Sequence, residues 1–496
     1  MRVNLLHPPD RISATAPTGD HAVTDLGLES VFAAMSGPDP LIGQVVQATV
    51  LAPITDPAVI GYRQAVLTDC LTHPSAIREL YRIAVMPTQI RRWPVANGRR
   101  PGGKLVLSLP AFGELLGCLR RLRAHCRDHA TDFSSAGLRA LVDTVTDHFD
   151  DAYLDTIETH LTAVQFEHGL HLGAGLGLGN KIADIVVHEP LTPWRGRFGS
   201  DRRAMRAFRP IEDPEARFNP QLNPIVELRD RALGDLAAVV SYAVDHIHGF
   251  FERLRTELAF YLGCLNLHEH LTAAGIPTCL PTVHPAGTNT LRCNGLRDIT
   301  LCLSARGEVV GNDLDATGRT LLVVTGANNG GKSTFLRSVG AAQVMMQAGM
   351  FVVAERFEAT VRTGIFTHFV TDEDRTMTYG KLVEELVRMR AVVDRIGPGS
   401  LLLSNESFAS TSEGDAARIL TPLVEALLDS SVQLVLVTHL YEFADRRHRG
   451  AHPGDLFLRA GRRPDGRRTF RLVAGAPEPS SHAEEIFRQV FPEDQP

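Results

Sequence analysis

The chain has 496 residues, of which 44% are hydrophobic and 22% are charged, and its formal net charge is −6. This ordinary globular balance excludes a disordered chain, and the length corresponds to about three domains. The negative charge excludes a surface covered with nucleic-acid-binding charge, although a local basic patch is compatible with it.

The cysteines and the apolar segments limit the class of protein. The seven cysteines include no Cys-x-x-Cys pair, so they form neither a disulfide framework nor a zinc ribbon. The first residues lack the long apolar core of a signal peptide. No apolar stretch approaches the about 20 residues that a membrane helix needs. We therefore expect a soluble cytoplasmic protein without membrane contact.

The first part of the chain is predicted to be mainly helical. Residues 1–25 mix Pro, Asp, Ser, Thr and Gly, which is typical of a tail or lead-in. Over 26–290 apolar residues recur at helical spacing. The proline-free stretch 230–270 predicts a helix of about 40 residues, which would be about 60 Å long. Such a helix suits a lever, so we expect an all-α core or lever domain over 26–290.

Two basic stretches, residues 87–110 and 186–225, interrupt the helical pattern. In the second, Trp194, Phe198 and Phe208 lie among arginines, and aromatic side chains beside cations can stack on exposed bases. We regard this stretch as a basic insert that binds DNA phosphates. The alternative is a solvated face or a set of intersubunit ion pairs. The candidate DNA contacts are Arg195, Arg197, Arg202, Arg203, Arg206 and Arg209.

From 291 to 496 the pattern changes to short apolar runs that alternate with helices. Residues 321–326, 400–406 and 432–439 are predicted to be buried strands, each running into polar residues. This alternation predicts an α/β domain with a mainly parallel sheet. Near the end, Pro464-Asp465-Gly466 separates two strand-like runs and predicts a hairpin turn.

A complete G-x-x-x-x-G-K-[ST] motif lies between the first of these strands and a helix. Its glycines would let backbone N–H groups surround phosphates at the positive end of that helix. Lys332 would neutralise the β- and γ-phosphates, and Ser333 would hold Mg²⁺. The alternative, a chance Gly-rich turn, does not explain the strand–loop–helix context. The expected ligands are ATP and Mg²⁺, held by Gly326, Ala327, Asn328, Asn329, Gly330, Gly331, Lys332, Ser333 and Thr334.

Polar residues at the ends of the other two strands are predicted to serve the metal and the attacking water. Glu406 would polarise the water, and Asn405 stands where P-loop proteins usually have an Asp that helps hold the metal. An amide oxygen carries no formal charge, so metal affinity and rate would be reduced. His439 would hydrogen-bond the γ-phosphate or the water, whereas a lone histidine after a strand is more often structural. The candidate catalytic residues are thus Glu406, His439 and Lys332, and the candidate metal ligands are Ser333, Asn405 and Glu406.

The segment TGANNGGKSTFLRSVG resembles the phosphate loop of the MutS family, and THLYEF at 438–443 resembles that family's switch-histidine strand end. The resemblance is strong over 310–490 and weaker over 28–290. It implies an ABC-type P-loop ATPase domain that dimerises through composite nucleotide sites. In the family an aromatic residue before the ATPase strand packs on adenine; here Val309 and Val310 stand in its place, and Val310 is the candidate base contact.

The loop after Glu406 departs from the family pattern. The family's Gly-Arg-Gly element is replaced by Phe408-Ala409-Ser410, while the hydroxyl residues Thr411 and Ser412 match. The resemblance implies that these hydroxyls reach the γ-phosphate of a neighbouring subunit. The alternative is a hydrophilic loop with no partner.

The resemblance also implies what this protein would not do. Mismatch-repair members carry a recognition domain with a Phe-x-Glu wedge and a connector, and we expect this chain to lack both. Phe112-Gly113-Glu114 spells the tripeptide but lies in a leucine-rich helical context. The resulting hypothesis is a homodimeric ATPase acting on structured or branched DNA in repair or recombination. The alternatives are a nucleotide-gated protein scaffold and a pseudo-ATPase weakened by Asn405.

Overall fold

The computed structural model describes residues 3–11, 13–90, 101–164, 171–176, 182–188, 224–304, 307–370, 380–463 and 467–478. The chain divides into two compact units, each discontinuous in sequence. Unit 1 comprises residues 1–3, 78–131 and 140–255, and unit 2 comprises residues 4–77, 132–139 and 256–496. This division cuts across the predicted boundary near 290, because the first helices of the chain belong to the same unit as the predicted ATPase domain.

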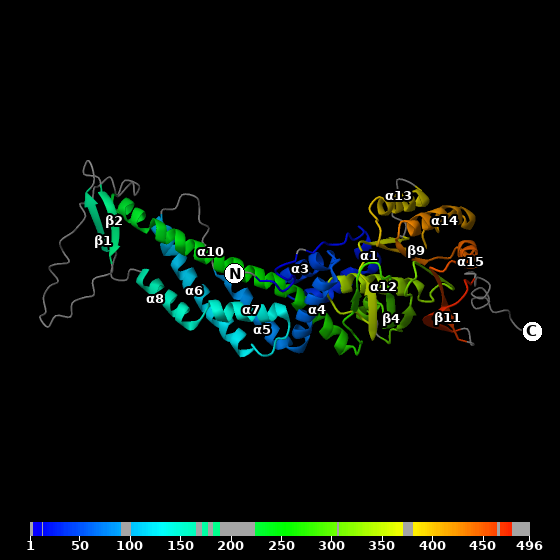
Figure 1. Ribbon diagram of the computed structural model, residues 1–496, viewed down its shortest axis with the longest axis horizontal. Helices are drawn as coiled ribbons and strands as arrows, with labels where there is room; N and C mark the ends of the chain where they lie inside the picture. Colours follow the sequence, from blue (N-terminus) through cyan, green and yellow to red (C-terminus); the bar gives the residue numbers. More distant parts are fainter. Residues whose placement is uncertain are drawn as a thin grey trace, which may run out of the picture. The chain divides into compact units, whose positions relative to one another are not determined.

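Unit 1 is built from long helices and one pair of strands (Figure 1). Helix α6 (Pro101–Asp128) contacts α8 (Asp151–Val164), and Arg120 of α6 pairs with Asp155 and Glu158 of α8. The strands β1 (His171–Leu176) and β2 (Ile182–His188) pair antiparallel. The expectation of an all-α region over 26–290 is therefore wrong at this point. The β-branched residues of β2 favour a strand over a helix. The other helices of this part of the chain are α5 (Pro74–Gln89), α7 (Ala136–His148) and the first part of α10 (Pro224–Ala273).

Helix α10 has 50 residues, so the predicted long helix is present and extends beyond both predicted ends. No helix in the described part of the chain is long and apolar enough to cross a membrane.

A six-stranded sheet forms the centre of unit 2, with strand order β12-β11-β6-β10-β9-β8. All neighbouring strands run parallel except β12, which pairs antiparallel with β11 at one edge. The predicted parallel sheet and the two predicted strands of the terminal hairpin are thus observed, whereas the turn Pro464-Asp465-Gly466 lies outside the described residues. The strands are β6 (Leu321–Thr325), β8 (Ile365–Phe369), β9 (Leu401–Asn405), β10 (Gln433–Val437), β11 (Asp455–Arg462) and β12 (Arg468–Ala474).

Helices cover both faces of this sheet (Figure 1). Successive strand residues point to opposite faces. Leu402 belongs to a core cluster with residues of the helices α13 and α14, whereas the Leu403 side chain lies against α12 at Gly340. The wholly buried strands therefore position their C-terminal ends rigidly. The helices are α12 (Lys332–Gln347), α13 (Lys381–Val393), α14 (Glu413–Asp429) and α15 (Tyr441–Arg449).

A second sheet of unit 2 has four strands in the order β3-β7-β4-β5. The short helix α11 (Ile299–Ser304) lies between β4 and β5 in the sequence, and Asp298 caps its first turn by accepting from Thr300 N and Leu301 N. The strands are β3 (Thr282–His284), β4 (Leu291–Leu296), β5 (Asn312–Asp315) and β7 (Arg356–Thr360).

The predicted N-terminal lead-in is not a free tail, because its residues 4–25 form part of unit 2. Leu5 is fully buried, and Thr18 forms a parallel bridge with Ile365 at the open edge of the large sheet. Arg63 holds the segment in place, because it donates to Leu6 O at 2.8 Å and to Ala348 O at 3.1 Å. The first four helices follow: α1 (Ala22–Leu26), α2 (Leu28–Ser36), α3 (Pro40–Val50) and α4 (Pro57–Thr72), the last two capped by Asp-Pro pairs.

Candidate nucleotide site

The phosphate loop connects the central strand β6 to α12, as the motif predicts. Gly326 and Gly331 have φ values of 108° and 92°, a backbone region that favours glycine. The Lys332 side chain is buried, and its Nζ donates to Gly326 O at 2.9 Å and to Ala327 O at 3.0 Å. Burial lowers the pKa of this ammonium, and the charge of Glu406 partly opposes the shift. The loop therefore wraps around a buried cation at the positive end of a 16-residue helix, where anions bind readily.

The hairpin β11–β12 packs directly on the loop glycines. A Cβ added at Gly330 would lie 2.6 Å from the Cβ of Ala460 in β11. A Cβ at Gly331 would lie 3.4 Å from the carbonyl oxygen of Phe470 in β12. The adjacent glycines Gly330 and Gly331 thus allow the close approach of the hairpin, and Gly331 also allows the conformation of the loop.

Two of the predicted metal ligands, Ser333 and Asn405, contact each other. Asn405 is the last residue of β9, and Ser333 is the second residue of α12. Ser333 Oγ donates a hydrogen bond to Asn405 Oδ1 at 2.9 Å. Hydroxyl and amide oxygens are ligands that Mg²⁺ accepts. The described residues contain no group of three His, Cys, Asp or Glu side chains that could hold a metal alone. This donor set fits an ion that is held mainly by a nucleotide's phosphates and completed by one or two protein oxygens.

Glu406 and His439 form a hydrogen-bonded pair beside this metal position. His439 follows β10, and its Nε2 donates to Glu406 Oε1 at 2.8 Å. This hydrogen bond is the main cause that lowers the pKa of the Glu406 carboxyl, with Lys332 adding a smaller effect of the same sign. Glu406 also has a positive φ of 56°, a strained conformation of the kind that collects at functional sites. The pair is thus an ionised carboxylate held in one orientation.

Buried contacts fix the residues that follow Glu406. His368 at the end of β8 donates from Nε2 to Glu385 O at 3.0 Å and accepts at Nδ1 from Ser407 Oγ at 2.6 Å. Burial lowers the pKa of His368 to about 4. The Phe408 N–H donates to the Glu385 carboxylate, and the Phe408 ring is fully buried in the core. Phe408 keeps a positive φ of 65°, so it occupies a glycine-like conformation where the family pattern has glycine.

Thr411 and Ser412 belong to the loop after Glu406. Among the described residues, neither forms a hydrogen bond with the phosphate loop of its own chain. Ser412 caps α14, where its Oγ donates to Asp415 Oδ2 at 2.7 Å. Thr411 lies just before this cap and is half-buried. Their expected contact is with a neighbouring subunit, so it stays a prediction.

A pocket of 380 Å³ adjoins the loop. It includes the predicted base contact Val310 and three predicted loop residues, Asn329, Gly331 and Thr334. It also includes Phe470, which sequence reasoning did not single out. Phe470 lies 139 positions after Gly331 in the numbering, and only the strand pairing of the hairpin brings it to the loop. The remaining lining residues are Leu301, Glu308, Val309 and Asn312.

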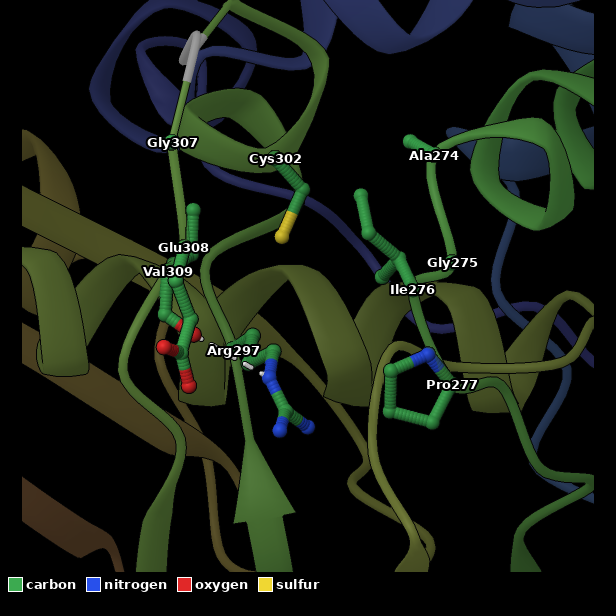
Figure 2. A pocket seen from close by; sticks show the side chains of 9 residues that line it. All are labelled: Ala274, Gly275, Ile276, Pro277, Arg297, Cys302, Gly307, Glu308 and Val309. Carbon is green, nitrogen blue, oxygen red and sulfur yellow. Dashed lines mark hydrogen bonds between the residues drawn. The ribbon is translucent and has the colours of Figure 1, made fainter.

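Another pocket has a volume of 620 Å³, and Figure 2 shows the residues that line it. Glu308 and Val309 line both pockets. Arg297 Nε donates to Val309 O at 3.2 Å, as the dashed line in Figure 2 marks, and its Nη1 donates to Gly295 O at 2.8 Å. Arg297 therefore fixes a backbone segment that lines both pockets.

The predicted DNA contacts Arg195, Arg197, Arg202, Arg203, Arg206 and Arg209 lie outside the described residues. Asn328 lies in the loop, and its role stays a prediction.

Comparisons with known proteins match two parts of the chain. Residues 55–274 match the MutS2 N-terminal domain, and residues 322–464 match MutS domain V, which is a P-loop ATPase domain. The chain is 29% identical over 161 residues to "MutS protein homolog 4" of Mus musculus. It is 32% identical over 151 residues to "DNA mismatch repair protein MutS" of Caulobacter vibrioides, and 34% identical over 137 residues to the protein of that name from Thermus thermophilus.

These segments cover 28% to 32% of this chain and 17% of each relative, so the chain matches about a sixth of the relatives' length. The two matched domains lie in the order that the resemblance implies, and the second contains the strand β6, Asn405, Glu406 and His439. This chain belongs to the MutS family.

Proposed function

We propose that this chain is a cytoplasmic, Mg²⁺-dependent ATPase that works as a homodimer on structured or branched DNA. The observation that carries the proposal is the meeting of three groups at the C-terminal ends of β6, β9 and β10. These groups are the buried Lys332, the Ser333–Asn405 oxygen pair and the Glu406–His439 pair. Ligand sites of parallel α/β sheets form at this end of the strands.

The proposed chemistry follows from the roles that these groups can fill. Lys332 and the N-terminal amides of α12 bind the phosphates, and Mg²⁺ supplies the positive charge that neutralises them further. Ser333 and Asn405 contribute oxygens to the ion. Glu406 is ionised, so it accepts a hydrogen bond from the attacking water, and His439 keeps the carboxylate oriented.

The test is ATP turnover with matched substitutions. Lys332→Ala should abolish nucleotide binding, because a buried loop loses its only cation among Gly326–Thr334. Glu406→Gln should keep binding and lower turnover by about 100-fold or more, the usual contribution of a positioned base. Glu425→Gln, at an exposed position of α14, is the control and should retain the parent rate. Turnover of Glu406→Gln at the parent rate would refute the assignment of the base.

The pseudo-ATPase alternative rests on Asn405, which offers a neutral oxygen to the metal position. Asn405→Asp adds a charge beside Ser333 without changing the size of the side chain. We expect the variant to need less Mg²⁺ for half-maximal turnover. An unchanged Mg²⁺ dependence and an unchanged rate would show that Asn405 is not a handicap.

DNA binding is supported by the family membership and by the basic insert near 186–225, and two of the relatives are named DNA mismatch repair proteins. The measurement is ATP turnover with duplex, branched and single-stranded DNA over a salt series. Contact with six phosphates predicts a log–log salt slope of about −5 on duplex DNA. Turnover indifferent to every DNA would favour the nucleotide-gated protein scaffold.

A further inference from the structure

The 620 Å³ pocket contains none of the residues that carry the proposed hydrolysis. Figure 2 shows the turn 274–277 and the segment 307–309 on facing sides of it, with Arg297 and Cys302 between them. Pockets that bind small molecules commonly measure about 300–1,000 Å³ and combine apolar walls with a few polar groups. The size and the mixed lining of this pocket therefore fit a small organic ligand.

Arg297 presents a guanidinium to this pocket in a fixed orientation. Its Nε donates to Val309 O at 3.2 Å, and its Nη1 donates to Gly295 O at 2.8 Å. Its Nη2 lies 3.7 Å from Glu355 Oε1, which is beyond hydrogen-bond length. A guanidinium carries five N–H donors, so Arg297 keeps donors for a ligand. The side chain is only 18% exposed, and partial removal from water strengthens its attraction for an anion.

The turn on the facing side is apolar and rigid. Helix α10 ends at Ala273, and Gly275 follows with a φ of 68°. Ile276 N donates to Leu271 O at 2.9 Å, which is the hydrogen bond of a regular helix stop. Ile276 and Pro277 are half-buried and line the pocket. This turn therefore offers a fixed apolar surface to the uncharged part of a ligand.

The pocket shares part of its lining with the pocket beside the phosphate loop. Glu308 and Val309 line both, and helix α11 contributes a residue to each. The buried Asp298 before α11 accepts from Arg337 Nε of α12 at 2.9 Å. Helix α12 begins at the phosphate loop. A ligand in the larger pocket would therefore contact the same backbone segment and the same helix that border the proposed nucleotide site.

We propose that this pocket binds a small organic anion and that its occupancy changes the affinity of the neighbouring nucleotide site. The carboxylate or phosphate group of the ligand pairs with the guanidinium fork of Arg297. The uncharged part of the ligand covers Ile276 and Pro277. Glu308 is exposed and brings a like charge to the same pocket, so it limits the affinity for the anion. The anion site is independent of the proposed function, whereas its effect on the nucleotide rests on that function.

The test compares three compounds that share a phenyl ring: phenylacetate, phenyl phosphate and the neutral phenylacetamide. Binding to the full chain is measured by calorimetry and by saturation-transfer NMR. We expect an anion to bind about 10-fold or more tightly than the amide, because hydrogen bonds to charged groups are the stronger ones. The tighter of the two anions identifies the charged group that the site takes. Titrations of phenyl phosphate are repeated on Lys332→Ala, so that binding at the phosphate loop is recognised.

Two substitutions with opposite effects locate the anion in this pocket. Arg297→Gln should weaken the binding of phenylacetate about 10-fold or more. Glu308→Gln should strengthen it about 2- to 5-fold, because a like charge is removed. Glu308 is exposed, so this second variant keeps the test decisive if Arg297→Gln fails to fold. The matched control is Glu425→Gln, at an exposed position of α14, which should leave the affinity for phenylacetate unchanged.

The outcomes that overturn the anion site differ from those that overturn the proposed function. Equal affinities for both anions and the amide, or an affinity for phenylacetate that neither Arg297→Gln nor Glu308→Gln changes, would overturn the site. Linkage requires the nucleotide to change the affinity for phenylacetate by the factor by which phenylacetate changes the affinity for the nucleotide. An affinity for phenylacetate that Mg²⁺-ADP leaves unchanged, in a chain that binds Mg²⁺-ADP, would overturn the coupling. A chain that binds phenylacetate but no nucleotide would overturn the proposed function and leave the anion site in place.

Discussion

Acidification should destabilise unit 2 through His368. This side chain is 1% exposed, and burial lowers its pKa from 6.5 to about 4. Between these two values the unfolded chain binds a proton that the folded chain does not, so stability falls as the pH falls. The effect corresponds to about 2 kcal/mol at pH 5 and approaches about 3.4 kcal/mol below pH 4. The positive charges of Arg388 and His21 act in the same direction.

The assay is urea unfolding followed by circular dichroism at pH values from 7.5 to 5, on the parent chain and on His368→Asn. Asparagine does not titrate and can still offer an acceptor to Ser407 Oγ. It costs stability at pH 7.5 because the packing and the bond to Glu385 O are lost. That cost should shrink by about 2 kcal/mol at pH 5, since only the parent loses the His368 contribution.

The control is His452→Asn, which changes an exposed histidine and should leave the pH dependence of the parent chain intact. A cost of His368→Asn that stays the same from pH 7.5 to pH 5 would refute the reasoning. It would mean that His368 accepts a proton in the folded chain as readily as in the unfolded one.

Three further predictions concern the contacts around the loop and the N-terminal segment. Gly331→Ala should destabilise the chain by about 1–2 kcal/mol in thermal unfolding, because its φ of 92° is unfavourable for alanine. Asn312→Ala should cost about 1–3 kcal/mol, because the buried Leu472 N–H loses its acceptor, and amides of β12 should exchange hydrogen faster. Arg63→Met should cost about 3 kcal/mol in urea unfolding by leaving the Leu6 and Ala348 carbonyls without donors, and Arg63→Lys should recover part of this loss.

Sequence reasoning reached the phosphate side of the site because the information there is local. The motif from Gly326 to Thr334 is continuous, and its strand–loop–helix context can be recognised from hydrophobic patterns alone. Asn405, Glu406 and His439 were also accessible, because each follows a buried apolar run and parallel strands bring such ends together. The contact of Asn405 with Ser333 and the contact of Glu406 with His439 depend on the order of the strands in the sheet, and this order could not be predicted from the sequence.

The position of Phe470 beside the phosphate loop could not be predicted from the sequence, for a physical reason. The Phe470 backbone lies beside Gly331 because β12 pairs antiparallel with β11 and because Asn312, in another sheet, donates to the Phe470 carbonyl. The β1–β2 pair was missed for a related reason, since short strands within a helical region give a weak periodic signal. The N-terminal residues read as a tail because polar and turn-forming residues dominate there, whereas a few buried contacts such as Leu5 determine their packing.

Two departures from the family pattern, one at the end of β9 and one in the loop that follows, have different consequences. Phe408 stands where glycine is expected, yet it adopts the glycine-like φ and buries its ring, so the loop stays anchored to the core. Asn405 keeps its contact with Ser333 but brings no charge to the metal position. Glu406 remains ionised and paired with His439, so the proposed hydrolysis keeps its proposed base. We therefore expect the two departures to lower the affinity for Mg²⁺ and to leave the activation of the water intact. The proposed activity is accordingly that of an ATPase that needs a high Mg²⁺ concentration.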